Sequence, residues 1–200
     1  MCTYFKRIQV KNITISFAYI LFFSVLLLLG GCSGITSGIV VDLSPDFIPD
    51  SSIDEFGNKI EVEVYDIRES ATLERTSLGA YLDDITLHPS ESELVRGIVE
   101  RALVQYIKGL DVNAESLKIF CGIKTFDVIT PSTPLYWDVT TRIEVVLRVE
   151  SNEKTVSGQN IERTWIWPSE EMITRVTTNA LDQLSQETIE ALPELVKNIL

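Results

Sequence analysis

Hydrophobic and polar residues alternate regularly over residues 59–65. Ile60, Val62 and Val64 fall on one side of residues 59–65, and Glu61 and Glu63 fall on the other. An alternation of period two predicts a strand with one buried and one solvated face.

Four further strands are predicted from the same pattern, over residues 39–43, 117–130, 136–149 and 155–167. The strand 155–167 is interrupted at Ser157-Gly158, where we expect a β-bulge. Between Glu69 and Pro89 the pattern dissolves, apart from a strand over Ala80–Leu87. A long loop is therefore expected in that region, and loops of that length are often functional.

Two helices are predicted from their start signals. Ser90 and Glu93 form a capping box, and apolar residues then recur at helical spacing until Gly109, a typical stop. The second helix opens at residues 168–171, Pro-Ser-Glu-Glu, where acidic residues favour the positive end of the helix dipole. Pro193 is expected to end this helix and to begin a short tail that docks on the core.

The order of these elements predicts an α+β fold, in which an antiparallel sheet carries two main helices on one face in a two-layer sandwich. The opposite face of the sheet is expected to stay solvated. It would carry the charged residues Glu61, Glu63, Arg142, Glu144 and Arg148.

The first 31 residues have the pattern of a secretory signal. Lys6, Arg7 and Lys11 precede an apolar run over residues 13–29, and the run ends in the small residues before Cys32. The alternative is an uncleaved transmembrane anchor with the basic residues in the cytoplasm. The sequence Leu-Gly-Gly-Cys at residues 29–32 resembles the lipobox of bacterial lipoproteins.

This resemblance implies cleavage before Cys32, with diacylglycerol on its sulfur and an N-acyl chain on the new terminus. Several chains are needed because a single acyl chain anchors only marginally. The expected organisation is a signal peptide over 1–31, a lipidated tether over 32–38 and one periplasmic domain over 39–200. By resemblance to lipoprotein sorting, Ser33 indicates the outer membrane and its periplasmic leaflet, with surface exposure as the alternative.

Charge and composition exclude several classes of function. The chain has 17 basic and 29 acidic residues. Loss of the three basic residues of the signal leaves 14 against 29, a formal charge of −15. Nucleic acid binding needs a basic surface and is not expected. Flat adhesion to anionic lipid headgroups is also disfavoured, so the body of the protein should stand off the membrane.

No catalytic or metal-binding pattern is found in the sequence. Cys2, Cys32 and Cys121 are the cysteines, and His88 is the one histidine. Cys121 lies in an apolar run and is interpreted as a buried thiol, and neither a disulfide within the mature chain nor a cysteine–histidine metal site is expected. Nucleophile-elbow, phosphate-loop and zinc motifs do not occur. We therefore expect that the protein is not an enzyme and that it needs no cofactor besides the acyl chains. Hydrolysis of a cell-wall fragment, one enzymatic possibility, would need two carboxylates that face one cleft.

Two groups of residues are candidates for contact with a partner or ligand. Asp66 and Arg68 form either such a contact or a structural ion pair that ties the strand end to the next loop. The aromatic residues Tyr136, Trp137, Trp165 and Trp167 form either a platform for sugar or peptide or ordinary sheet packing.

A lipobox, a strand end with the pattern V-x-D-x-R at residues 64–68, and Leu78-Gly79 precede a capped helix, three strands and a long C-terminal helix. This order resembles the YajG-like family of Gram-negative lipoproteins. The resemblance implies an outer-membrane-anchored periplasmic lipoprotein with a binding or scaffold role, whose partner is an envelope protein or the cell wall. The alternative is an accessory lipoprotein of a lipid or lipopolysaccharide transport system.

Overall fold

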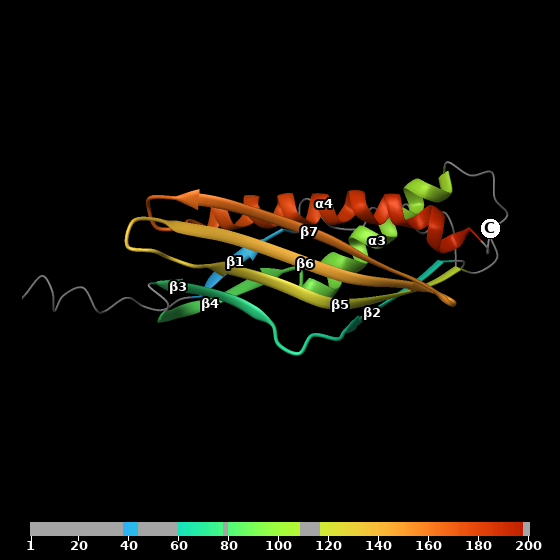
Figure 1. Ribbon diagram of the computed structural model, residues 1–200, viewed down its shortest axis with the longest axis horizontal. Helices are drawn as coiled ribbons and strands as arrows, with labels where there is room; N and C mark the ends of the chain where they lie inside the picture. Colours follow the sequence, from blue (N-terminus) through green and yellow to red (C-terminus); the bar gives the residue numbers. More distant parts are fainter. Residues whose placement is uncertain (1–37, 44–59, 78–79, 109–116, 198–200) are drawn as a thin grey trace, which may run out of the picture. The chain divides into compact units, whose positions relative to one another are not determined.

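A computed structural model describes residues 38–43, 60–77, 80–108 and 117–197, all within the unit Gly38–Leu200. The predicted signal, the lipobox and Cys32 lie outside the described residues. The elements, drawn in Figure 1, are β1 (Ile39–Asp42), β2 (Ile60–Asp66), β3 (Thr72–Ser77), β4 (Ala80–His88), α3 (Glu91–Lys108), β5 (Leu117–Thr130), β6 (Trp137–Val149), β7 (Asn152–Thr164) and α4 (Glu170–Val196).

The strands form one seven-stranded sheet in the order β1-β4-β3-β5-β6-β7, with β2 also paired to β5. The predicted α+β class is confirmed, but the sheet is mixed and not antiparallel throughout. The pairs β3–β4, β5–β6 and β6–β7 are antiparallel, whereas β1–β4, β2–β5 and β3–β5 are parallel. Parallel pairing needs a crossover connection, and α3 lies in the part of the chain that connects β2 and β3 to their parallel partner β5.

Both helices cover one face of the sheet, as predicted. The core-facing residues of β5 and β6 alternate with partly exposed ones, and α4 packs across β6 and β7 while α3 contacts β2, β5 and α4. The hydroxyls of Thr141 on β6 and Thr177 on α4 lie 3.0 Å apart in this buried layer. The predicted solvated face is also confirmed, since Glu61, Arg142 and Arg148 are exposed and Glu63 and Glu144 are partly exposed.

The predicted helix starts are confirmed by their hydrogen bonds. The carboxylate of Glu93 accepts from the backbone N–H of Ser90 at 2.9 Å and from its hydroxyl at 2.7 Å. Ser169 caps α4 by accepting from the N–H of Met172 at 3.3 Å. The bonds from the backbone N–H groups of Ser90 and Met172 satisfy donors near the start of a helix that otherwise lack an intrahelical partner. The predicted stop at Gly109 lies outside the described residues.

The long loop predicted between Glu69 and Pro89 is wrong, although its strand over Ala80–Leu87 is confirmed within β4. Residues 72–77 form β3, which is inserted between β4 and β5. Its polar sequence hides the strand because Arg75 turns inward and binds Asp83, a buried carboxylate, through Nε at 2.8 Å. A buried ion pair thus occupies positions where an apolar pattern would have indicated a strand.

The expected bulge at Ser157-Gly158 is also wrong, because β6 and β7 pair without interruption from Trp137–Thr164 to Val149–Asn152. Gly158 instead permits close approach of α4. A Cβ atom there would overlap the carbonyl oxygen of Ala180 and lie 2.9 Å from the nitrogen of Leu184. On either side, the N–H groups of Ser157 and Gln159 donate to side chains of α4, which covers the free edge of the sheet.

The expected end of the second helix at Pro193 is wrong as well. Pro193 lies inside α4, which continues to Val196. Leu195 and Val196 are buried in the core, and the side-chain amide of Asn152 donates to the carbonyl oxygen of Leu195 at 3.0 Å. Tertiary packing of the last turn therefore outweighs the helix-breaking tendency of proline.

Candidate functional site

The two strands β2 and β3 lie one after the other along the same edge of β5. β2 pairs with Leu117–Ile123, and β3 pairs with Asp127–Thr130. Between them, residues 67–71 leave the sheet, and the ladder is interrupted beside Lys124–Phe126. Lys124 itself interrupts the register between β5 and β6.

The side chain of Arg68 fills this break in the sheet. Its guanidinium group donates to both carboxylate oxygens of Asp66, from Nε at 2.9 Å and from Nη2 at 2.6 Å. Nη1 lies 3.4 Å from Glu91, in the first turn of α3, and 3.5 Å from the backbone carbonyl oxygen of Phe126. The side chain is only 8% exposed, so it joins β2, β5 and α3 from within.

This geometry favours the structural interpretation of Asp66 and Arg68. The hydrogen bonds from the side chain and the backbone N–H of Arg68 lower the pKa of the Asp66 carboxyl to about 2. Because the guanidinium group is already engaged on three sides, it offers little surface to a partner. Asp66 remains about half exposed and borders the hollow described next.

A hollow of about 490 Å³ lies on the solvated face of the sheet, and Gly122 is one of the residues that line it. The ring of Phe120 stacks on Tyr65 with centroids 6.2 Å apart, and the guanidinium carbon of Arg148 lies 5.3 Å from the centre of the Phe120 ring. We call this feature the outer-face hollow; it is lined by Tyr65, Asp66, Ile67, Phe120, Gly122, Val146, Arg148 and Glu153.

The outer-face hollow was not predicted from the sequence, except for Asp66. It depends on the parallel pairing of Tyr65 with Gly122, which no local pattern indicates. The one usable signal is the glycine in an otherwise regular strand, which often marks a close approach or a missing side chain. Here the side chain of Ile67 occupies the space that a Cβ atom on Gly122 would need, with its Cδ1 atom 2.8 Å from that position.

The four predicted aromatic residues gather in two pairs at one end of the domain. Tyr136 and Trp165 meet edge to face with centroids 5.7 Å apart, and Trp137 and Trp167 do so at 5.6 Å. Trp165 and Trp167 follow β7, which ends at Thr164, and so lie beyond the strand on which they were expected. We call this region the aromatic end; it consists of Leu135, Tyr136, Trp137, Trp165, Ile166 and Trp167.

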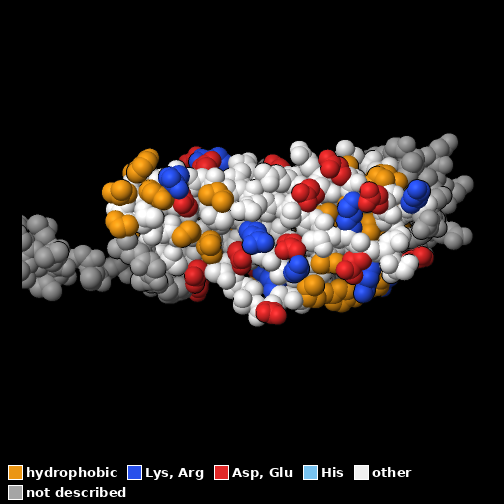
Figure 2. All heavy atoms as spheres, viewed as in Figure 1, with side chains coloured by type: hydrophobic (Ala, Val, Ile, Leu, Met, Phe, Trp, Pro, Cys, Tyr) orange, Lys and Arg blue, Asp and Glu red, His pale blue; other side chains and the backbone are white. Residues whose placement is uncertain are grey.

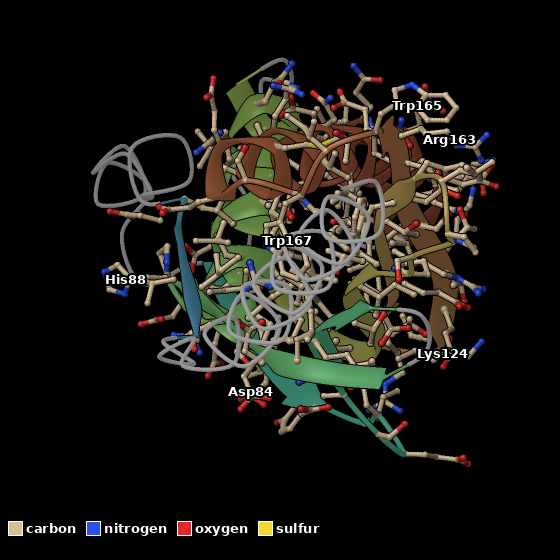
Figure 3. All side chains as sticks on the ribbon, turned by 90° about the vertical axis from the view of Figure 1, so that its left-hand side faces the viewer. Asp84, His88, Lys124, Arg163, Trp165 and Trp167 are labelled. Atoms are coloured by element: carbon tan, nitrogen blue, oxygen red, sulfur yellow. The ribbon has the colours of Figure 1, made fainter. Side chains whose placement is uncertain are left out.

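Two arginine side chains hold the aromatic end in place from the sheet. The guanidinium carbon of Arg163 lies 3.8 Å from the centre of the Tyr136 ring, and that of Arg75 lies 4.8 Å from the centre of the Trp167 ring. Figure 3, which faces this end, shows Trp165 beside Arg163. The buried Nε1 atom of Trp137 has no hydrogen-bond partner among the described residues.

The remaining candidates have simpler surroundings. Cys121 is fully buried, as expected, and burial together with the nearby negative charge of Glu100 raises its thiol pKa to about 12. Within the described part of the chain, no three potential metal-ligand side chains come together. Neither described helix combines the length and apolarity that a membrane-spanning segment requires.

Comparisons with known proteins give distant likenesses only. No protein-family model matches the chain, and no curated protein matches it. A crystal structure described as that of an uncharacterized protein is 9% identical, covers 80% of this chain and 94% of its own, and has a TM-score of 0.36. A protein of Xanthomonas campestris described with the family name DUF330 is 14% identical, with coverages of 79% and 92% and a TM-score of 0.36.

A third solved structure is described as a "putative lipoprotein" from Caulobacter crescentus. It is 8% identical, covers 71% of this chain and 88% of its own, and has a TM-score of 0.26. Likenesses of this strength carry no argument about this chain. None of these three descriptions names a YajG-like lipoprotein, so that resemblance stays a prediction and function has to be inferred from the residues themselves.

Proposed function

We propose that this protein is a lipid-anchored envelope lipoprotein with a non-catalytic binding or scaffold role, held through Cys32 on the periplasmic side of the outer membrane. The lipobox at residues 29–32 and Ser33 support the anchor and its location. The first strand begins at Ile39, so a folded domain follows the proposed attachment point after a short tether. The acyl chains on Cys32 are the only attached groups that this proposal requires.

The outer-face hollow is the observation that carries the binding role. It lies on a sheet face that also carries ion pairs, such as Lys124 with Glu144 at 2.7 Å. Its walls include the aromatic rings of Tyr65 and Phe120, and charged groups of both signs stand at its border. Apolar walls with a few polar groups at the border suit the side chains of a peptide segment or protein partner.

Site-directed photo-crosslinking in membranes tests this binding role. A photoreactive amino acid in place of Phe120 should give a reproducible adduct with an envelope protein or with the cell wall. The same amino acid in place of Asp182, an exposed residue of α4, serves as the matched control and should give none. Recovery of the chain alone, or equal labelling from the two positions, would contradict the proposal.

The alternative role in lipid or lipopolysaccharide transport gains no support from the described residues. Such a role needs an apolar groove that can hold an acyl chain. The core between sheet and helices is filled by buried side chains, and two hollows lined by described residues lie on the outer face of the sheet. Lipid extracted with the purified protein, in a fixed ratio to it, would favour this alternative.

A further inference from the structure

The aromatic end is built from two segments that carry no charge. Residues 131–137 read PSTPLYW, and residues 164–168 read TWIWP. In a chain of which 23% is charged, these two segments in contact form a surface without charged side chains of their own. The pairing of Trp137 with Thr164 brings them side by side.

Four of the six side chains of the aromatic end are exposed although they are large and apolar, and Tyr136 and Trp137 are partly exposed. Leu135 is 72% exposed, Trp165 69%, Ile166 75% and Trp167 45%. Figure 2 shows hydrophobic side chains gathered at the left end of the described domain, with a second group at its lower right. Contiguous apolar surface of this kind indicates an interaction surface.

The direction and register of β1 show where the chain enters the domain. A Cβ atom on Gly38 would lie 3.0 Å from the carbonyl oxygen of Asp84, so Gly38 lies beside Asp84. Asp84 pairs with Glu74, Glu74 with Ile129, and Ile129 with Thr140. Gly38 and Thr140 are therefore at about the same level along the strands.

The aromatic end begins only three residues from that level. Trp137 precedes Thr140 by three residues, a distance of about 10 Å along a strand. β1 runs parallel to β4 and in the same direction as β6, so its start faces the aromatic end (Figure 1). The six residues from Ser33 to Gly38 span at most about 20 Å, which allows Cys32 to reach the plane of the aromatic end.

We propose that the aromatic end inserts into the interfacial region of the bilayer that holds the lipid anchor, so that the domain stands end-on on the membrane. The proposal rests on the lipid anchor at Cys32 proposed above. Trp and Tyr are enriched at membrane–water interfaces, and Leu and Ile add apolar area that an acyl boundary can cover.

The charge distribution favours this orientation over contact through a side of the domain. A mature chain with a formal charge of −15 is repelled from anionic headgroups. The aromatic end avoids this repulsion because its two segments have no acidic residue, and the neighbouring Asp138 is paired with Arg163, whose Nε donates at 2.8 Å. End-on insertion places the uncharged surface at the bilayer and leaves the outer-face hollow accessible.

Tryptophan fluorescence tests the proposal directly, because all three tryptophans of the chain belong to the aromatic end. The mature lipidated protein, which begins at Cys32, would be reconstituted into phosphatidylcholine vesicles with and without brominated acyl chains, in the absence of any protein partner. Bromine in the acyl region should quench the emission. The double variant Leu135→Ser/Ile166→Ser, which keeps every tryptophan, should lose most of this quenching.

The variant Gln186→Ser is the control, since Gln186 is an exposed, uncharged residue of α4 outside the outer-face hollow. Its neighbour Glu187 accepts from Ser157, which lies seven residues along β7 from Thr164 and so far from the aromatic end. The control variant should leave the quenching unchanged, and circular dichroism should show both variants folded. Protein that carries its lipid by mass but shows no quenching would overturn this proposal and leave the proposed function intact. Protein without lipid that fails to bind vesicles would overturn both.

Discussion

Replacement of Arg68 by alanine tests whether the Asp66–Arg68 pair is structural. The guanidinium group of Arg68 links Asp66, Glu91 and the carbonyl oxygen of Phe126 across the break between β2 and β3. Its loss leaves the other groups without these bonds at a site where the arginine is 8% exposed. Breaking a buried pair costs about 3–5 kcal/mol. Because Asp66 is half exposed and keeps its hydration, we expect Arg68→Ala to lower the free energy of unfolding by about 2–3 kcal/mol.

Equilibrium urea unfolding measures this loss as a decrease in the free energy of unfolding. Arg175→Ala is the matched control, because Arg175 also binds a carboxylate, Glu162, through two nitrogens but is about half exposed. It should cost less than about 1 kcal/mol. Arg68→Lys should recover only part of the loss, because an ammonium group cannot reproduce the planar fork.

If the role of Arg68 is structural, the folded Arg68→Ala protein should still form the photo-crosslinked adduct when the photoreactive amino acid replaces Phe120. The reasoning is refuted if Arg68→Ala costs no more than Arg175→Ala. It is refuted as well if Arg68→Ala leaves stability unchanged but abolishes the adduct, since that result would assign Arg68 to the partner contact.

Three further outcomes are expected. Gly158→Ala should cost at least about 2 kcal/mol in urea unfolding, because a Cβ atom overlaps the backbone of α4; a neutral effect would contradict the close approach. The pKa of the Asp66 carboxyl is lower in the folded protein than in the unfolded chain, where it is about 4, so the ionised carboxylate stabilises the fold above about pH 4. This contribution to the free energy of unfolding is about 1 kcal/mol after solvent screening, and it is lost as the pH falls toward 2. Asp66→Asn should remove that part of the pH dependence, and an unchanged profile would contradict it. Cys121, with its pKa raised to about 12, should react with maleimide at pH 8 only after unfolding, whereas rapid labelling of the folded protein would show an accessible thiol.

Regular elements with one apolar face could be predicted from the sequence. The strands β5 and β6 and the start of α3 at its capping box follow from local pattern alone. β3 could not be predicted, because Arg75 and Asp83 occupy inward positions and satisfy each other there. The glycine at position 158 was misinterpreted for a related reason, since the helix that requires it arrives from far along the sequence.

The same distinction between local pattern and distant contacts applies to the candidate sites. Tyr136, Trp137, Trp165 and Trp167 could be brought together because a hairpin relates β6 to β7. Their exposure could not be predicted, since it depends on β7 ending at Thr164. The outer-face hollow depends on parallel pairing between strands that are separated by β3, β4 and α3 in the sequence.

The intact mass of the protein purified from bacterial membranes tests the central claim most directly. We expect a chain that begins at Cys32 and carries the added mass of diacylglycerol and an N-acyl chain. A mass that includes residues 1–31, or a chain that begins at Cys32 without lipid, would contradict the lipid anchor and with it the proposed location on the membrane.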